Sequence, residues 1–201
     1  DNTAVGHRAI ASATSGERNT AVGYQALEDC TLGERNTTIG YKAGGNITAG
    51  SSNTVIGFLA GNIQTGDNNT CIGNDADPSA DNVSNEVVLG NTSVATLRCN
   101  VQSISSLSDG RDKTEVEDLP LGLDFIDTLR PVKFKWDTRD GNGKDGSYAA
   151  GFIAQDLQSA QSTSSAEYLN MVMDSNPNRL EARYSQLIPV LVQAIKDLKS
   201  E

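Results

Sequence analysis

One pentapeptide recurs along the first half of the chain at nearly constant spacing. It reads NTAVG at Asn2 and at Asn19, NTTIG at Asn36, NTVIG at Asn53 and NTCIG at Asn69. Successive copies begin 17, 17, 17 and 16 residues apart. Several copies are followed by an aromatic residue and then by a second turn signal. Each repeat is therefore predicted to contain a short β-segment, a turn, another short segment and another turn.

A repeat of this size buries very little surface, so it must stack on its neighbours along the chain. Only 5% of the residues are aromatic and 37% are hydrophobic, and this half is not expected to fold as a compact monomer. Three chains wrapped together would bury apolar positions that one chain leaves open, of which Val22, Ile39, Ile56 and Ile72 are the clearest. Residues 1–80 are predicted to form a mainly β stalk, as a trimeric β-prism, β-roll or β-helix. The repeats resemble those of trimeric phage fibres and of trimeric bacterial adhesin heads.

Residues 81–107 differ in character and are assigned to the end of the stalk and a linker. Glu86–Gly90 and Val94–Leu97 are predicted to form two ordinary strands, because both are short apolar runs on either side of a turn at Asn91. Gln102–Ser106 is polar and is predicted to be a linker.

From Ser108 onward the pattern becomes that of a small α/β (α+β) domain. Leu119–Leu129 has the apolar spacing of a helix and ends before a proline. Val132–Trp136 and Tyr148–Ile153 are predicted to be strands that flank a turn-rich loop, Asp137–Gly146. A further helix is expected to begin near Ala154.

The last segment, Tyr184–Lys199, has the spacing of an amphipathic helix. Leu187, Leu191, Ala194 and Leu198 follow one another at intervals of four, three and four residues, as in the a/d positions of a coiled coil. This seam either seals a domain that trimerises elsewhere or belongs to the core of a single chain, and spacing alone does not separate the two.

Ser108–Lys113 reads SDGRDK and matches the S-D-x-R-x-K signature of a known family. That signature opens the self-cleaving intramolecular chaperone domains of endosialidase tailspikes, phage neck appendages and L-shaped tail fibres. The resemblance continues in order with LDFIDTLRPVKFKW from Leu123, GFIAQD from Gly151 and YSQLIPVL from Tyr184. Residues 108–201 are therefore identified as a similar intramolecular chaperone and autoprotease domain.

The resemblance implies autoproteolysis next to Ser108 by a Ser-Lys dyad, with Ser108 as nucleophile and Lys113 as general base. A serine hydroxyl can also reach the carbonyl of the preceding residue through a five-membered ring, which favours the bond between Leu107 and Ser108. Cleavage between Ser108 and Asp109 is the alternative. Asp109 and Arg111 match the signature as well, and either support catalysis or form a structural ion pair.

A lysine with its reference pKa of about 10.4 is almost wholly protonated at pH 7. Burial in an apolar environment can lower the pKa of a lysine by about 3 to 5. The dyad is therefore expected to work only where its lysine is removed from water.

Other chemistry finds little support in the sequence. The net charge of -10 makes attraction to nucleic acid or to anionic membranes unfavourable. His7 is the only histidine, lies inside a repeat, and is interpreted as a repeat-surface residue. Asp140–Gly146 has a lysine, Lys144, at a position where a calcium loop needs a ligand, so it is interpreted as a hairpin loop. No metal and no cofactor is expected.

The three cysteines, Cys30, Cys71 and Cys99, form no CxxC pair and cannot all pair within one chain. They are typical of a reducing compartment in which the chain folds. Cys71 occupies the repeat position that Ala21, Thr38 and Val55 fill in other copies, so it is predicted to be a small packed residue.

Taken together, these features predict the C-terminal region of a phage tail fibre or tailspike. The chaperone domain would assemble a homotrimer in the host cytoplasm, align the stalk chains in register and then release itself, leaving a virion fibre that binds a host-cell surface receptor. The alternative is a non-cleaving trimeric adhesin or receptor-binding fibre tip. A DNA-binding regulator is disfavoured because neither half of the chain is basic.

Overall fold

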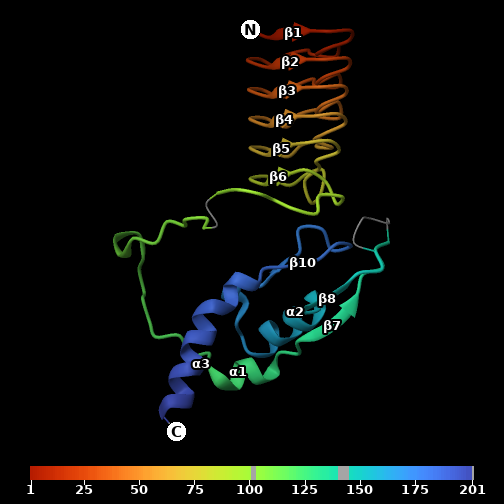
Figure 1. Cartoon of the computed structure of the whole chain (residues 1–201). Helices are drawn as coiled ribbons and strands as arrows, with labels where there is room; N and C mark the ends of the chain where they lie inside the picture. The colour runs from red at the N-terminus through yellow and green to blue at the C-terminus, as the bar shows by residue number, and fades with distance from the viewer. Residues whose placement is uncertain (101–102, 140–144, 201) are drawn as a thin grey trace. The chain divides into compact units, whose positions relative to one another are not determined.

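The computed structural model describes residues 1–100, 103–139 and 145–200, in two compact units, Asp1–Ala95 and Thr96–Glu201. The first unit contains six short parallel strands stacked in chain order (Figure 1). These strands are β1 (Thr3–Val5), β2 (Thr20–Val22), β3 (Thr37–Ile39), β4 (Thr54–Ile56), β5 (Thr70–Ile72) and β6 (Val87–Leu89). Equivalent residues of neighbouring repeats pair with one another, as in Thr20 with Thr37. The first unit is therefore a β-solenoid with one strand per repeat, which confirms the predicted β stalk.

The asparagine that opens the pentapeptide links successive coils, and Asn19, Asn36, Asn53 and Asn69 are buried. The backbone N–H of Asn36 donates to Oδ1 of Asn19 at 2.9 Å, and Nδ2 of Asn36 donates to the carbonyl of Gly50 at 2.8 Å. The backbone N–H of Asn53 in turn donates to Oδ1 of Asn36 at 2.9 Å. Because a buried amide must have its hydrogen bonds satisfied, this ladder explains why asparagine begins the five pentapeptide copies.

The glycine that ends each pentapeptide allows the coils to approach closely. Gly40 has a φ of +135°, and a Cβ built there would lie 2.2 Å from the carbonyl oxygen of Gly57. Any side chain at this position would collide with the backbone of the next coil.

The middle residue of each strand points into the solenoid. Ala21, Thr38, Val55 and Cys71 are fully buried. They pack with the other core residues of this unit, namely Ala26, Leu27, Cys30, Ala43, Ile47, Ala60, Ile63 and Ala76. A single chain thus encloses a core, so the expectation that this half cannot form one alone was wrong. The predicted packing of Cys71 is confirmed.

The second segment of each repeat is not a strand, contrary to prediction. In the coil that follows β2, Gln25 and Leu27 have φ values of +54° and +53°, in the left-handed region. The coils still bond to one another there, since the N–H of Gln25 donates to the carbonyl of His7 at 2.8 Å. Alternating left-handed residues bend this half of the coil into turns while keeping its hydrogen bonds.

Thr38 offers a direct test of the core. Its Oγ1 is buried and has no hydrogen-bond partner among the described residues. Replacing Thr38 with valine removes the unsatisfied hydroxyl and keeps the shape, so it should raise the free energy of unfolding by about 1 to 3 kcal/mol. Urea unfolding of Thr38→Val measures this, with Thr37→Val on the half-buried neighbouring position as control and an expected change within about 0.5 kcal/mol. A lower unfolding midpoint for Thr38→Val would contradict the assignment.

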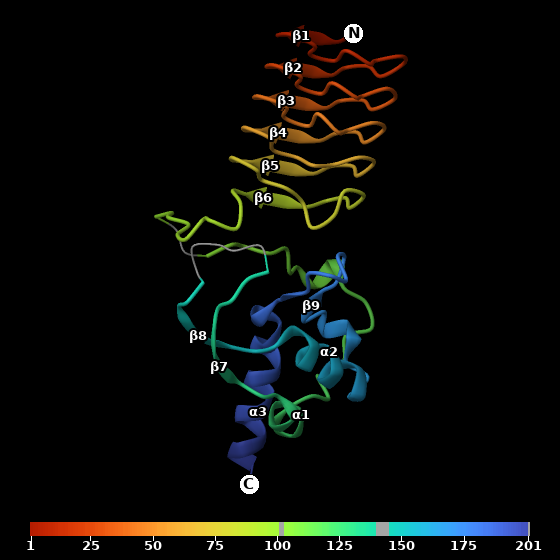
Figure 2. The same ribbon diagram turned by 90° about the vertical axis from the view of Figure 1, so that its right-hand side faces the viewer.

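The second unit is a small α/β fold that ends in a helix, as predicted (Figure 2). Its elements, in chain order, are η1 (Gly110–Asp112), α1 (Leu123–Thr128), β7 (Val132–Lys135), β8 (Tyr148–Gly151), α2 (Ala154–Thr163), η2 (Glu167–Leu169), β9 (Val172–Met173), β10 (Glu181–Ala182), η3 (Tyr184–Leu187) and α3 (Ile188–Ser200). β7 pairs with β8, and β9 with β10, both antiparallel. The core of this unit contains Phe125, Leu157, Ala166, Leu169, Met171, Val172, Leu187 and Val190.

Two predicted elements of the chain differ from the structure. α1 begins at Leu123 instead of Leu119, because Pro120 and Gly122 disfavour helix and the N–H of Leu123 is capped by Oδ2 of Asp197 at 3.0 Å.

The predicted strand Val94–Leu97 is absent. The side chain of Asn91 accepts the N–H of Ser93 at 2.9 Å, and this turn ends the ladder after β6. The predicted linker Gln102–Ser106 and the loop Asp137–Gly146 lie partly outside the described residues.

Candidate functional site

A short turn brings the side chains of Ser108 and Lys113 together. Asp109 caps η1, since its carboxylate accepts the backbone N–H of Arg111 at 2.9 Å. The chain reverses through η1, and the N–H of Lys113 then bonds to the carbonyl of Gly110 at 3.3 Å. As a result Nζ of Lys113 lies 2.6 Å from Oγ of Ser108.

Lys113 makes a second contact that was not predicted from the sequence. Its Nζ also donates to the carbonyl oxygen of Ser108, at 3.2 Å. One ammonium group thus contacts both the hydroxyl and the carbonyl of the same serine. An amine in this position can exchange a proton with the hydroxyl and can also polarise the carbonyl of the Ser108–Asp109 peptide.

Asp109 and Arg111 form an ion pair beside this contact. Nη2 of Arg111 lies 2.5 Å from Oδ2 of Asp109, and Nε lies 3.1 Å from each carboxylate oxygen. The hydrogen bonds from the Arg111 side chain, and then the one from its backbone, hold the pKa of Asp109 below its usual value. The carboxylate therefore stays ionised and faces Arg111.

The pair of Ser108 and Lys113 is open to solvent in the single chain. Both residues are exposed, and the preceding residue, Leu107, is 85% exposed. Nothing in the described part of one chain supplies the removal from water that a lysine base was expected to need.

The remaining sequence candidates lie elsewhere. His7 belongs to the solenoid and stacks on Tyr24 with ring centroids 5.2 Å apart. The described residues hold no group of three or more His, Cys, Asp or Glu side chains placed to bind a metal ion. They also include no helix of the length and apolarity needed to cross a bilayer. The calcium-like loop Asp140–Gly146 lies mostly outside the described residues.

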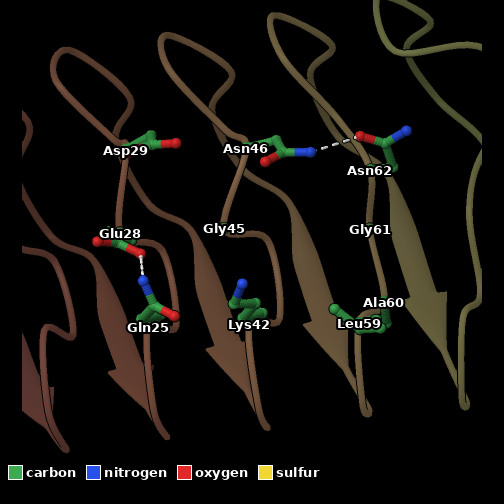
Figure 3. A pocket seen from close by; sticks show the side chains of 10 residues that line it. All are labelled: Gln25, Glu28, Asp29, Lys42, Gly45, Asn46, Leu59, Ala60, Gly61 and Asn62. Atoms are coloured by element: carbon green, nitrogen blue, oxygen red, sulfur yellow. Dashed lines mark hydrogen bonds between the residues drawn. The ribbon is translucent and has the colours of Figure 1, made fainter.

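A hollow lies on the turn side of the solenoid (Figure 3). Polar pairs line it: Nδ2 of Asn46 donates to Oδ1 of Asn62 at 2.7 Å, and the amide of Gln25 donates to the carboxylate of Glu28. These side chains satisfy one another, and no nucleophile paired with a base lies among them.

Comparison with known proteins finds a match in the second unit. Residues 108–164 match the family model described as chaperone of endosialidase, and the match begins at Ser108 itself. No curated protein and no solved structure matches the chain. The resemblance expected from the sequence is thereby confirmed for residues 108–164, which match the model of a family of self-cleaving peptidases.

Proposed function

We propose that this chain is the C-terminal region of a phage tail fibre or tailspike, and that residues 108–201 assemble three copies and then cut themselves away next to Ser108. The observation that carries the proposal is the 2.6 Å contact between Nζ of Lys113 and Oγ of Ser108, placed where the family match begins. Folding takes place in the host cytoplasm, and the product is a virion fibre that binds a receptor on the host surface.

The chemistry follows from the neighbouring atoms. Oγ of Ser108 attacks the carbonyl carbon of Leu107, and Lys113 in its neutral form takes the hydroxyl proton. The carbon–nitrogen bond breaks as the proton passes to the leaving nitrogen, which leaves an ester between Leu107 and Oγ. Water then hydrolyses this ester and frees residues 108–201. Because Nζ also contacts the carbonyl of Ser108, the bond between Ser108 and Asp109 remains the alternative.

The solenoid explains why such a chaperone is useful. Its coils repeat almost the same sequence, and neighbouring strands pair through equivalent residues. A slip of one copy against another by a whole coil therefore costs little locally, while long-range β association is slow and prone to aggregation. A globular unit that joins the three chains at one end fixes the register.

The test measures the intact mass and the oligomeric state of the purified full chain. The expected result is a trimer containing fragments 1–107 and 108–201. Fragments 1–108 and 109–201 would assign the cut to the other side of Ser108, because the masses differ by one serine. Trimers of uncut chains would favour a static fibre tip, and a monodisperse monomer at micromolar concentration would overturn the proposal.

A further inference from the structure

The outer face of the solenoid sheet carries an apolar row. Strand residues alternate between the inside and the outside, and the third residue of each strand points outward. This apolar row consists of Val5, Val22, Ile39, Ile56, Ile72 and Leu89. Ile39, Ile56 and Ile72 keep 40%, 36% and 40% of their surface exposed. Six β-branched or leucine side chains, one from each strand, thus form a row across the outer face of the sheet.

A row of stacked rings lies beside the apolar row, with each ring two residues after the last residue of its strand. This ring row consists of His7, Tyr24, Tyr41 and Phe58, with neighbouring centroids 5.1 to 5.2 Å apart and ring planes within 12° of parallel. Tyr24, Tyr41 and Phe58 are 44%, 41% and 52% exposed. The apolar row and the ring row together form one continuous band along the solenoid.

The band carries no Asp, Glu, Lys or Arg, although 21% of the chain is charged. All six strands and the two residues after each one lack these residue types. The turn side of the same coils is different, and Glu28 and Asp29 lie there (Figure 3), while Nζ of Lys42 lies over the ring of Tyr41, 5.8 Å from its centroid. Depletion of charge with exposed aromatic and aliphatic side chains is the pattern of the centre of a protein interface.

We propose that this band is the surface through which three copies of the solenoid pack, each coil against the same coil of its partners. The inference rests on the proposed function, which brings three copies together at their C-terminal units. Strands of a sheet lie about 4.7 to 4.9 Å apart, so a partner that contacts every coil must repeat at that spacing. A second copy of this chain has that spacing and presents the same band. In a threefold assembly, equivalent residues also lie at equal heights.

The size of the band explains why it needs a chaperone. Six strands and five residues per strand cover roughly 25 Å by 16 Å, or about 400 Å² per copy. A stable interface buries about 800 Å² per partner, so the band alone falls short. The band also does not fix the register between copies. A shift of one copy against another by one coil places isoleucine against isoleucine again. The solenoids therefore pack in register only while another part of the chain holds them together.

Cysteine cross-linking tests the proposal on the full chain. Ile56→Cys is made in a Cys99→Ser background, since Cys99 is exposed whereas Cys30 and Cys71 are buried. Oxidised glutathione takes up the two electrons of the disulfide. Three thiols at one height allow one disulfide per trimer, so up to two thirds of the chains should run as linked pairs on a non-reducing gel. Ala49→Cys, exposed and outside the band, should give unlinked chains.

Co-expression of Ile39→Cys and Ile56→Cys chains then reads the register. Links between two copies of residue 39, or two copies of residue 56, are expected in peptide mass maps, and links from 39 to 56 would overturn the coil-against-same-coil arrangement. Circular dichroism checks that each variant keeps the solenoid fold. If light scattering shows trimers but residue 56 forms no link, the band is not the interface between copies, and the proposed function still stands. Monomers throughout would overturn both.

Discussion

Ser108→Ala chains are expected to remain uncut while still forming trimers. The substitution removes the attacking oxygen, which is the hydroxyl oxygen that Nζ of Lys113 contacts at 2.6 Å. The loss of cleavage should be at least about 10³-fold, as for removal of a nucleophile from a catalytic unit. Denaturing gels and intact mass over time measure it. Ser106→Ala is the matched control, since Ser106 is also exposed and lies two residues upstream.

Substitutions of Lys113 separate its chemistry from its contacts. Lys113→Arg keeps a cation that can donate to Oγ and to the carbonyl of Ser108, but arginine does not give up its proton in proteins. Both Lys113→Arg and Lys113→Ala should therefore slow cleavage by about 10² to 10⁴-fold, the usual contribution of a general base. A Lys113→Arg chain that cuts at the wild-type rate would reduce this residue to a structural contact.

The repeat made much of the solenoid predictable, including the packed position of Cys71, but not why that position points inward. Its period predicted a β-segment in every repeat, and alternation within three residues left two possible faces. The choice follows from the opening asparagine: Asn36 must be buried to bond Asn19 and Asn53, and this orients Thr38 inward and Ile39 outward. That chain of hydrogen bonds runs between coils and has no signal within one repeat.

The turn half of each coil was predicted wrongly for a related reason. Gln25 and Leu27 are ordinary residues, and nothing in their side chains favours a positive φ. They adopt it because the neighbouring coils supply hydrogen bonds in that conformation, as from Gln25 to His7. Tertiary contacts override local preference there. The hairpin β7–β8 and the start of α2 were predictable because their patterns are local.

The contact between Ser108 and Lys113 was predictable from the family signature, whereas its exposure was not. The family signature predicts which two side chains are in contact. Their burial depends on packing with other parts of the protein or with other copies, which the signature does not describe. In the single chain both side chains face solvent. The terminal helix shows the same division: the seam predicted from spacing splits, with Leu187 and Ala194 buried in the core and Leu191 and Leu198 exposed.

The exposed part of this helix suggests that cleavage depends on assembly of the trimer. α3 buries Val190 and Ala194 on one face and exposes Ile188, Leu191 and Ile195 on the opposite face. The exposed residues follow at intervals of three and four, so they form a continuous apolar stripe along the helix. A stripe of this kind is stable when helices of other copies cover it.

Leu191→Asp should abolish both trimerisation and cleavage. Leu191 is 44% exposed, so the core of the unit does not depend on it, whereas a charge there opposes burial between copies. Burial of one leucine contributes about 1.5 to 3 kcal/mol, and a trimer loses three at once. Light scattering and denaturing gels on the same samples measure both effects. Lys196→Asp places the same aspartate on another exposed position of α3 and should leave both intact.

The reason cleavage should fail in a monomer lies at the dyad. Ser108 and Lys113 are exposed to water in one chain, whereas a lysine base needs a site that excludes water. Packing between copies is the step that can exclude water and turn the amine into a base. Cleavage would then report assembly and free the chaperone unit from correctly formed trimers. If Leu191→Asp chains are monomeric by light scattering and still cut at the wild-type rate, cleavage does not depend on assembly, while the dyad stands; if they are monomeric and uncut, assembly precedes the chemistry.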